Sequence, residues 1–155
     1  MLVDDTIERL GEEVAALTGR VKGTLDLAEL LARKALPQYT PAAFVSHNGI
    51  VGGAAEFSTG AFLQDAGEVV SVTLVQRTAG DVTGARGQGE LHRLVWEVIY
   101  ALAGWAPEPV EDESESGPDP VGVFALRRGR VLRLDAGTVF YQLDFDLRQQ
   151  IRVIA

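Results

Sequence analysis

Residues 84–105, GARGQGELHRLVWEVIYALAGW, form the stretch that decides the fold. Successive residues of an α-helix are rotated by about 100°, and this rotation gathers most of the apolar side chains of the stretch on one face: Leu91, Leu94, Val95, Val98, Ile99 and Leu102. The spacing predicts a helix, and we expect its apolar face to pack on a sheet.

A second face of this helix is also largely apolar, and it carries His92, Trp96, Tyr100 and Ala103. The remaining polar stripe is narrow, which indicates either a helix inside a large protein or a helix that a partner covers. The chain has only 155 residues, so we favour a partner. Because large aromatic side chains are enriched in interface cores, His92, Trp96 and Tyr100 are candidate subunit-interface residues. The alternative is that another element of the same chain covers them.

Two helices are expected near the N-terminus. Residues 3–17 place apolar side chains on one helical stripe, although Gly11 lies within it and costs about 1 kcal/mol relative to alanine. Asp26 and Glu29 have the spacing of an N-terminal capping pair and predict a second helix over residues 27–35, which Pro37 ends.

The segment between these helices and the central one predicts strands. Residues 42–48 form an apolar run that leads into a glycine-rich loop at 49–53. A weak strand signal covers residues 56–63, and residue types that are typical of a turn follow at 65–67. Residues 69–77 alternate as a strand does, and a long loop over 78–89 then leads into the helix.

Three strand signals follow the central helix, over residues 121–126, 131–134 and 138–151, with a turn expected at Arg128 and Gly129. In the last of them, side chains face the core at Val139, Tyr141, Leu143, Phe145 and Leu147. Before these strands, residues 108–120 are rich in proline and carboxylates, which predicts a flexible acidic loop. The whole pattern predicts a single α+β domain over residues 1–155, with a mainly antiparallel sheet and helices packed on one face.

Composition narrows the possible functions. The chain has no cysteine and a net charge of −8, so we expect neither a thiolate site nor nucleic-acid binding, which needs a basic surface. No apolar run approaches the roughly 20 residues of a membrane helix, and the first residues do not resemble a signal peptide. We therefore expect a soluble, unexported protein.

No pattern predicts a catalytic residue, a metal site or a cofactor. His47 and His92 lack ligand spacing, and the segment GARGQG lacks the lysine of a phosphate-binding loop. Asp144 and Asp146 share one strand face, where carboxylates more often protect an edge than act as an acid and base pair. Two non-enzymatic readings remain: an assembly protein, or a small-ligand-binding or regulatory domain with its pocket between the central helix and the sheet.

The order of several motifs resembles the tail terminator proteins of Mu-like, contractile-tailed phages. These motifs are an N-terminal amphipathic helix, a glycine-rich stretch with GQGELH, a helix that ends in ALAGWAP at residues 101–107, and a long strand, VFYQLDFDL, at residues 139–147.

This resemblance implies a structural protein of a phage or phage-tail-like particle that assembles as a hexameric ring. Such a ring binds the last ring of the tail tube at the head-proximal end of the virion tail, after assembly in the host cytoplasm. It stops tube and sheath growth and provides the surface that joins the head, so the expected partners are the chain itself, tube, sheath and neck proteins. In such a ring, we expect Arg77 and Arg86 to meet an acidic partner.

Overall fold

The structure is a computed structural model that describes residues 2–33, 37, 39–78, 85–108, 122–135 and 137–154. It is a single α+β domain, as predicted. The elements follow in the order α1 (Leu2–Glu13), a 3-10 turn η1 (Ala15–Leu17), β1 (Val21–Gly23), α2 (Thr24–Ala32), β2 (Ala42–Ser58), β3 (Ala61–Arg77), α3 (Ala85–Leu102), β4 (Ala125–Asp135) and β5 (Thr138–Ile154).

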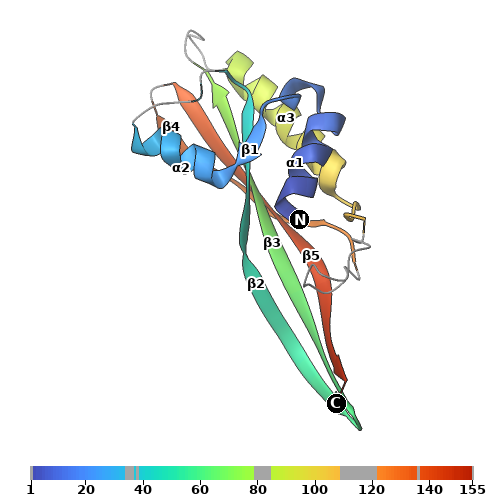
Figure 1. The fold of residues 1–155 in the computed structure, drawn as a ribbon. Helices are drawn as coiled ribbons and strands as arrows, with labels where there is room; N and C mark the ends of the chain where they lie inside the picture. Colours follow the sequence, from blue (N-terminus) through green and yellow to red (C-terminus); the bar gives the residue numbers. More distant parts are fainter. Residues whose placement is uncertain are drawn as a thin grey trace.

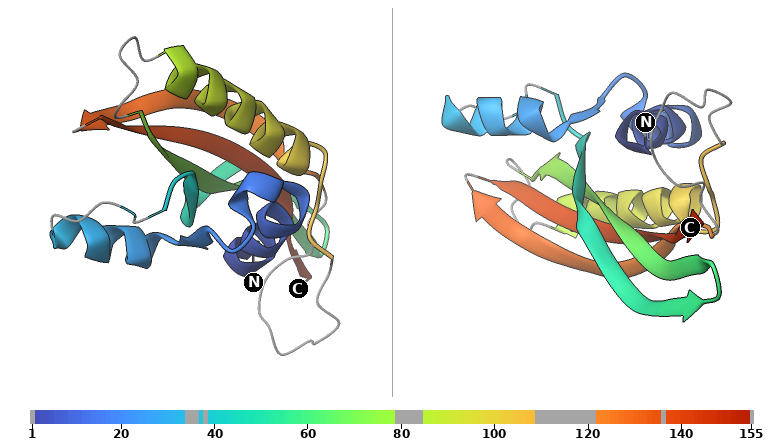
Figure 2. Two further views of the ribbon diagram at one scale, coloured as in Figure 1. Left: turned by 90° about the horizontal axis from the view of Figure 1, so that it is seen from above. Right: turned by 60° about the horizontal axis from the view of Figure 1, so that its bottom comes forward.

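The five strands form one sheet in the order β1-β2-β3-β5-β4. The short strand β1 pairs with β2 in parallel, and every other pairing is antiparallel. Helices α1 and α3 lie side by side on one face of the sheet, whereas α2 extends away from them at the β1 edge (Figure 1). Figure 2 shows the strong twist of the sheet, with β4 and α1 on opposite sides of the molecule.

The main core lies between this helical layer and the sheet. The predicted apolar face of α3 is buried, and so are the inward side chains of β5, with Tyr141 partly buried against them. Both predictions are confirmed, because a long run with one clear period identifies its buried face without tertiary information. A smaller buried cluster lies on the opposite face of the sheet and consists of Ala42, Phe44, Val75 and Phe140.

The two N-terminal helices begin and end at other residues than predicted. Helix α1 ends at Glu13 and a separate 3-10 turn follows, because Val14 is extended with φ −112° and ψ 101°. Leu10, Val14 and Leu17 are nevertheless all buried. Helix α2 begins at Thr24 rather than at residue 27, and its cap is Gly23 rather than an acidic pair.

The loop predicted at 49–53 and the turn predicted at 65–67 are wrong, because β2 and β3 continue through both segments. The strand signal over 56–63 covers the end of β2 and the start of β3. The two strands meet at a hairpin turn formed by Thr59 and Gly60. Glycine weakens a strand on its own, but here β5 pairs along β3 over the whole stretch, with Gly67 opposite Arg148. This long-range pairing overrides the local turn signals.

Strand β4 runs through the turn expected at Arg128 and Gly129. A Cβ atom on Gly129 would lie 2.9 Å from the Leu143 Cδ2 and Tyr141 Oη atoms. Glycine is therefore needed here for close packing on β5 rather than for a turn. Strand β5 lies between β3 and β4, so Asp144 and Asp146 do not protect an edge as predicted.

Helix α3 begins before the last two of the four glycines that were expected to form a loop, so Gly87 and Gly89 lie within it. It ends before Gly104, whose φ of 80° suits glycine at a helix C-terminus. Residues 79–84 of the expected loop, residues 109–120 of the acidic segment and residue 121 of the expected strand lie outside the described residues. In the described part of the chain, none of the helices has the length and apolar character needed to span a membrane.

Candidate interaction surfaces

The outer side of α3 carries all three predicted interface residues. Trp96 is 45% exposed and Tyr100 is 79% exposed, and their ring centroids lie 6.0 Å apart. His92, one turn before Trp96, is also exposed. No other element of the described chain covers these side chains, so the aromatic pair is presented to solvent.

Strand β4 also carries exposed apolar side chains. Helix α1 contacts β1 and β2, and α3 contacts β3, whereas β4 lies at the far edge of the sheet. Its apolar side chains Leu126, Val131 and Leu134 pair with Phe145, Tyr141 and Val139 of β5, which face the helices. All three β4 side chains are exposed, Leu134 by 74%. We call these residues, with Trp96 and Tyr100, the β4–α3 face.

Of the two predicted loop arginines, Arg77 lies away from this face. Arg77 is exposed at the end of β3, where its backbone N–H donates to the Thr40 Oγ1 atom at 3.4 Å. Arg86 lies in the first turn of α3. The structure does not bring Arg77 to the aromatic pair.

A long arm is the surface that the sequence did not predict. The distal halves of β2 and β3 and the end of β5 project well beyond the helices (Figure 1). At its tip, Phe57 lies opposite Phe62 and Phe62 opposite Val153, with the two phenyl centroids 5.1 Å apart. Phe57 is 82% exposed, so the arm carries an apolar side without a cover. Alternation of apolar residues across the hairpin was the available signal, but the glycines obscured it.

The other side of the arm is polar. Arg148 contacts Asp65 at 2.7 Å, and Arg127 of β4 contacts Asp146 at 3.3 Å. A hollow of about 440 Å³ lies at the base of this side, between Asn48, Gly49 and Arg128. Pairs of this kind on an exposed surface contribute little to stability; they make the arm amphipathic.

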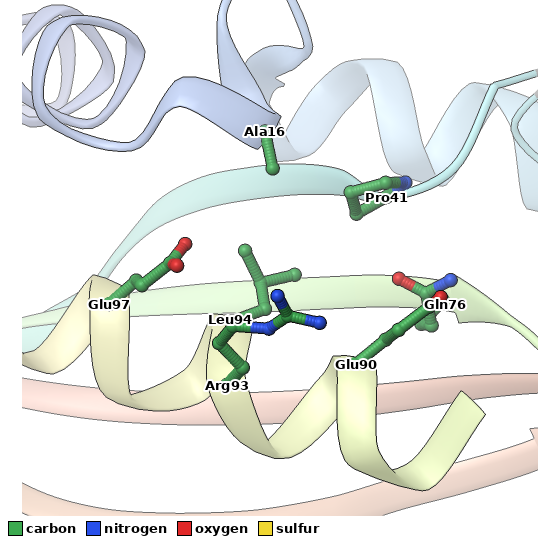
Figure 3. A pocket seen from close by; sticks show the side chains of 7 residues that line it. All are labelled: Ala16, Pro41, Gln76, Glu90, Arg93, Leu94 and Glu97. Carbon is green, nitrogen blue, oxygen red and sulfur yellow. The ribbon is translucent and has the colours of Figure 1, made fainter. Parts of the chain in front are cut away.

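A cleft lies between α3 and the adjacent elements, where the small-ligand reading placed a pocket (Figure 3). Its volume is about 250 Å³, and it is lined by Ala16, Pro41, Gln76, Glu90, Arg93, Leu94 and Glu97. This volume is below the range of about 300–1,000 Å³ that is usual for small-molecule sites. Among the described residues, no group of three His, Asp or Glu side chains could hold a metal ion.

Comparison with known proteins identifies the family of the chain. A family model described as phage tail terminator protein matches residues 2–155. No curated protein matches the chain. The matched family is structural and not enzymatic, which agrees with a molecule whose notable features are exposed faces rather than a reactive cleft.

Proposed function

The chain belongs to the phage tail terminator protein family, a family of tail components with a tail-capping structural role and tail-tube partners; from this premise we propose that it closes the head-proximal end of the tail as a hexameric ring. In the proposed ring, the chain binds the last ring of the tube. It thereby covers the surface on which the next tube subunit would add, and growth stops. The upper surface of the ring then joins the neck of the head.

The observation that carries this proposal is the exposed aromatic pair on α3. A ring of identical subunits needs a heterologous interface, in which two different patches of one chain meet head to tail. Trp96 and Tyr100 are of the residue types that dominate interface cores, and the fold leaves both exposed. His92 extends the same patch by one turn.

The finer parts of the proposal follow from the resemblance to Mu-like phages. We place the protein in a contractile tail, where sheath and neck proteins are further partners. Arg77 and Arg86 are the arginines assigned to an acidic partner, and the arm offers an apolar side to the tube. We also propose that residues 1–155 are one domain and that segment 108–120 is a flexible loop that orders on contact with a partner.

The test is the native mass of the purified protein across a concentration series, measured by light scattering after gel filtration and combined with negative-stain images. Six chains of 16.6 kDa give a ring of about 100 kDa. In Trp96→Ala and Tyr100→Glu we expect this species to be lost while the circular dichroism spectrum of the fold is kept.

Tyr39 provides a matched control, because it is 65% exposed and lies outside the β4–α3 face. Tyr39→Glu introduces the same charge as Tyr100→Glu and is expected to leave the ring intact. Equal loss of assembly in the Tyr39 variant would mean that any added charge disrupts the oligomer. Outright unfolding of the Trp96 and Tyr100 variants would assign these side chains to the core instead of an interface.

A further inference from the structure

The tip of the arm carries an apolar patch on the side of the sheet that bears the helices. Val153 follows the core residue Leu147 at an even spacing along β5, and the register places Phe62 opposite Val153 and Phe57 opposite Phe62. Phe57 is 82% exposed and Val153 is 55% exposed, because the helices of the described chain end well before the tip (Figure 1). We call Phe57, Phe62 and Val153 the arm patch.

The arm patch lies on an uncharged side of the arm. Its neighbours on the same side are Ala55, Gln64 and Ile151. The charged side chains near the tip belong to the alternate positions of the strands and project from the other side; they are Glu56, Asp65, Arg148 and Arg152. Charged residues are depleted at the centre of protein interfaces, so the patch suits an apolar partner.

The β4–α3 face has the same character. It exposes two aromatic and three aliphatic side chains. The arginines of β4 do not border it, since Arg128 and Arg130 pair with Asp144 and Gln142 on the opposite side of the sheet. The charged residues of α3 that line the cleft, such as Arg93, lie on the side of the helix that faces Ala16 and Pro41 (Figure 3).

The two patches cannot cover each other within one copy, because the arm runs away from the body that carries α3 (Figure 1). Together they contain four aromatic and four aliphatic side chains. An aromatic side chain buries about 150–250 Å² when it is fully covered. These groups can therefore form the centre of a specific interface, which buries about 1,200 Å² or more in total.

We infer that the arm patch of one copy lies on the β4–α3 face of the next copy. This inference rests on the proposed ring function, and it supplies the second patch that the heterologous interface of the ring requires. Phe57 meets Trp96 and Tyr100 at the centre of the contact, where aromatic side chains contribute most to binding. Nearer the base of the arm, the apolar side chains of Ile50 and Ile151 remain available to the tube.

Two matched variants test this contact. Tyr100→Glu places a carboxylate in the β4–α3 face, and Phe57→Glu places one in the arm patch. The native side chains are 79% and 82% exposed, so we expect both variants to keep the circular dichroism spectrum and melting temperature of the wild type. In sedimentation velocity, we expect each variant alone to remain a monomer of 16.6 kDa, because every contact then contains one altered patch.

An equimolar mixture of the two variants, at a concentration at which the wild type assembles, is the decisive sample. The Tyr100→Glu chain keeps its arm patch and the Phe57→Glu chain keeps its β4–α3 face, so one contact can form and no second contact can follow. We expect a 1:1 complex of about 33 kDa, twice the mass of the chain. A mixture that stays monomeric would overturn the inference.

The single variants exclude other pairings of the same patches. A contact between two arm patches would let the Tyr100→Glu variant form a homodimer, and a contact between two β4–α3 faces would let the Phe57→Glu variant do so. Either homodimer would overturn the inference. Rings formed by Phe57→Glu alone would also overturn it but leave the proposed function standing. A wild-type protein that stops at a pair with exchanged arms would keep the contact and contradict the ring.

A cross-link covers the case in which assembly requires a tail as template. The chain has no cysteine, so Ala55→Cys/Ala103→Cys places the only two thiols beside the arm patch and beside Tyr100, at two exposed positions. With a short bismaleimide at high protein concentration, we expect a ladder of covalent oligomers.

The control for the cross-link is Ser58→Cys/Ala103→Cys. Ser58 is exposed as well, but it directly follows Phe57 in β2 and therefore lies on the other side of the arm. We expect several-fold less product from the control. Equal yields from the two proteins, or no product from either, would contradict the contact.

Discussion

Phe124, the residue before β4, packs between the end of α3 and the sheet. Its ring stacks on Trp105 at a centroid distance of 5.5 Å and meets Phe145 edge-on at 6.1 Å. Its backbone N–H donates to the Trp105 carbonyl at 2.7 Å, and its own carbonyl accepts from the Gly104 N–H at 2.9 Å. One residue thus joins the end of α3 to the sheet.

Removal of this ring should therefore be costly. Phe124 is 1% exposed, and truncation of a buried phenylalanine to alanine costs about 3–5 kcal/mol. We expect Phe124→Ala to lower the free energy of unfolding by this amount in urea denaturation. The neighbouring Val123 is half exposed, and Val123→Ala should change stability by less than about 0.5 kcal/mol. Similar losses in the two variants would contradict the assigned role of Phe124.

Single residues were predictable where a periodic run contains them. The inward side chains of β5 are an example, because alternation alone separates Leu143 from Asp144. Long-range partners were not predictable. Asp144 accepts a hydrogen bond from the Ser71 Oγ atom at 2.6 Å, and Phe124 binds α3 through its backbone instead of extending a strand over residues 121–126. These contacts depend on chain segments that are far apart in sequence.

At the scale of the element, the first turns of α3 contain two glycines with different surroundings. A Cβ atom on Gly87 would lie 2.5 Å from the Thr78 Cγ2 atom and 3.3 Å from the Thr78 Cα atom, whereas a Cβ atom on Gly89 would have nothing within 4 Å. Alanine favours a helix over glycine by about 1 kcal/mol. The two positions therefore separate the effect of packing from that of helix propensity.

We expect Gly89→Ala to raise the free energy of unfolding by about 0.5–1 kcal/mol. Gly87→Ala should instead lower it by about 1–3 kcal/mol, the usual cost of overpacking. Thermal unfolding followed by circular dichroism measures both effects. Equal stabilisation by the two substitutions would show that α3 is not held close to the end of β3.

Elements were predictable where local signals agree with the tertiary structure, as in α3 and β5. The arm was missed because its local signals oppose its structure. Glycines at 49, 52, 53 and 67 indicate loops, and bulges interrupt the β2–β3 register near two of these places. Pairing with β5 stabilises the extended conformation. The sequence predicted two strands where the structure has β4 alone, for the same reason. Gly129 indicated a turn, but it packs closely on Tyr141 and Leu143 within the strand.

At the scale of the molecule, the fold separates a stable centre from two exposed faces. The centre is the α1–α3 layer on the sheet. The exposed faces are the β4–α3 face and the apolar side of the arm. The order of the sequence motifs predicted the fold class and the family. The arm was not predictable, because it arises only when the strands of the sheet are assembled.

The central claim is that the protein ends tail growth, and the length of tails made without it tests this claim most directly. Tails are purified from cells in which the coding sequence has been deleted and from cells in which it is supplied again from a plasmid. Their lengths are measured by negative-stain electron microscopy. We expect long tubes of variable length without the protein, and uniform tails with a ring at the head-proximal end when it is restored. Tails of unchanged, uniform length in the deletion would contradict the proposed function.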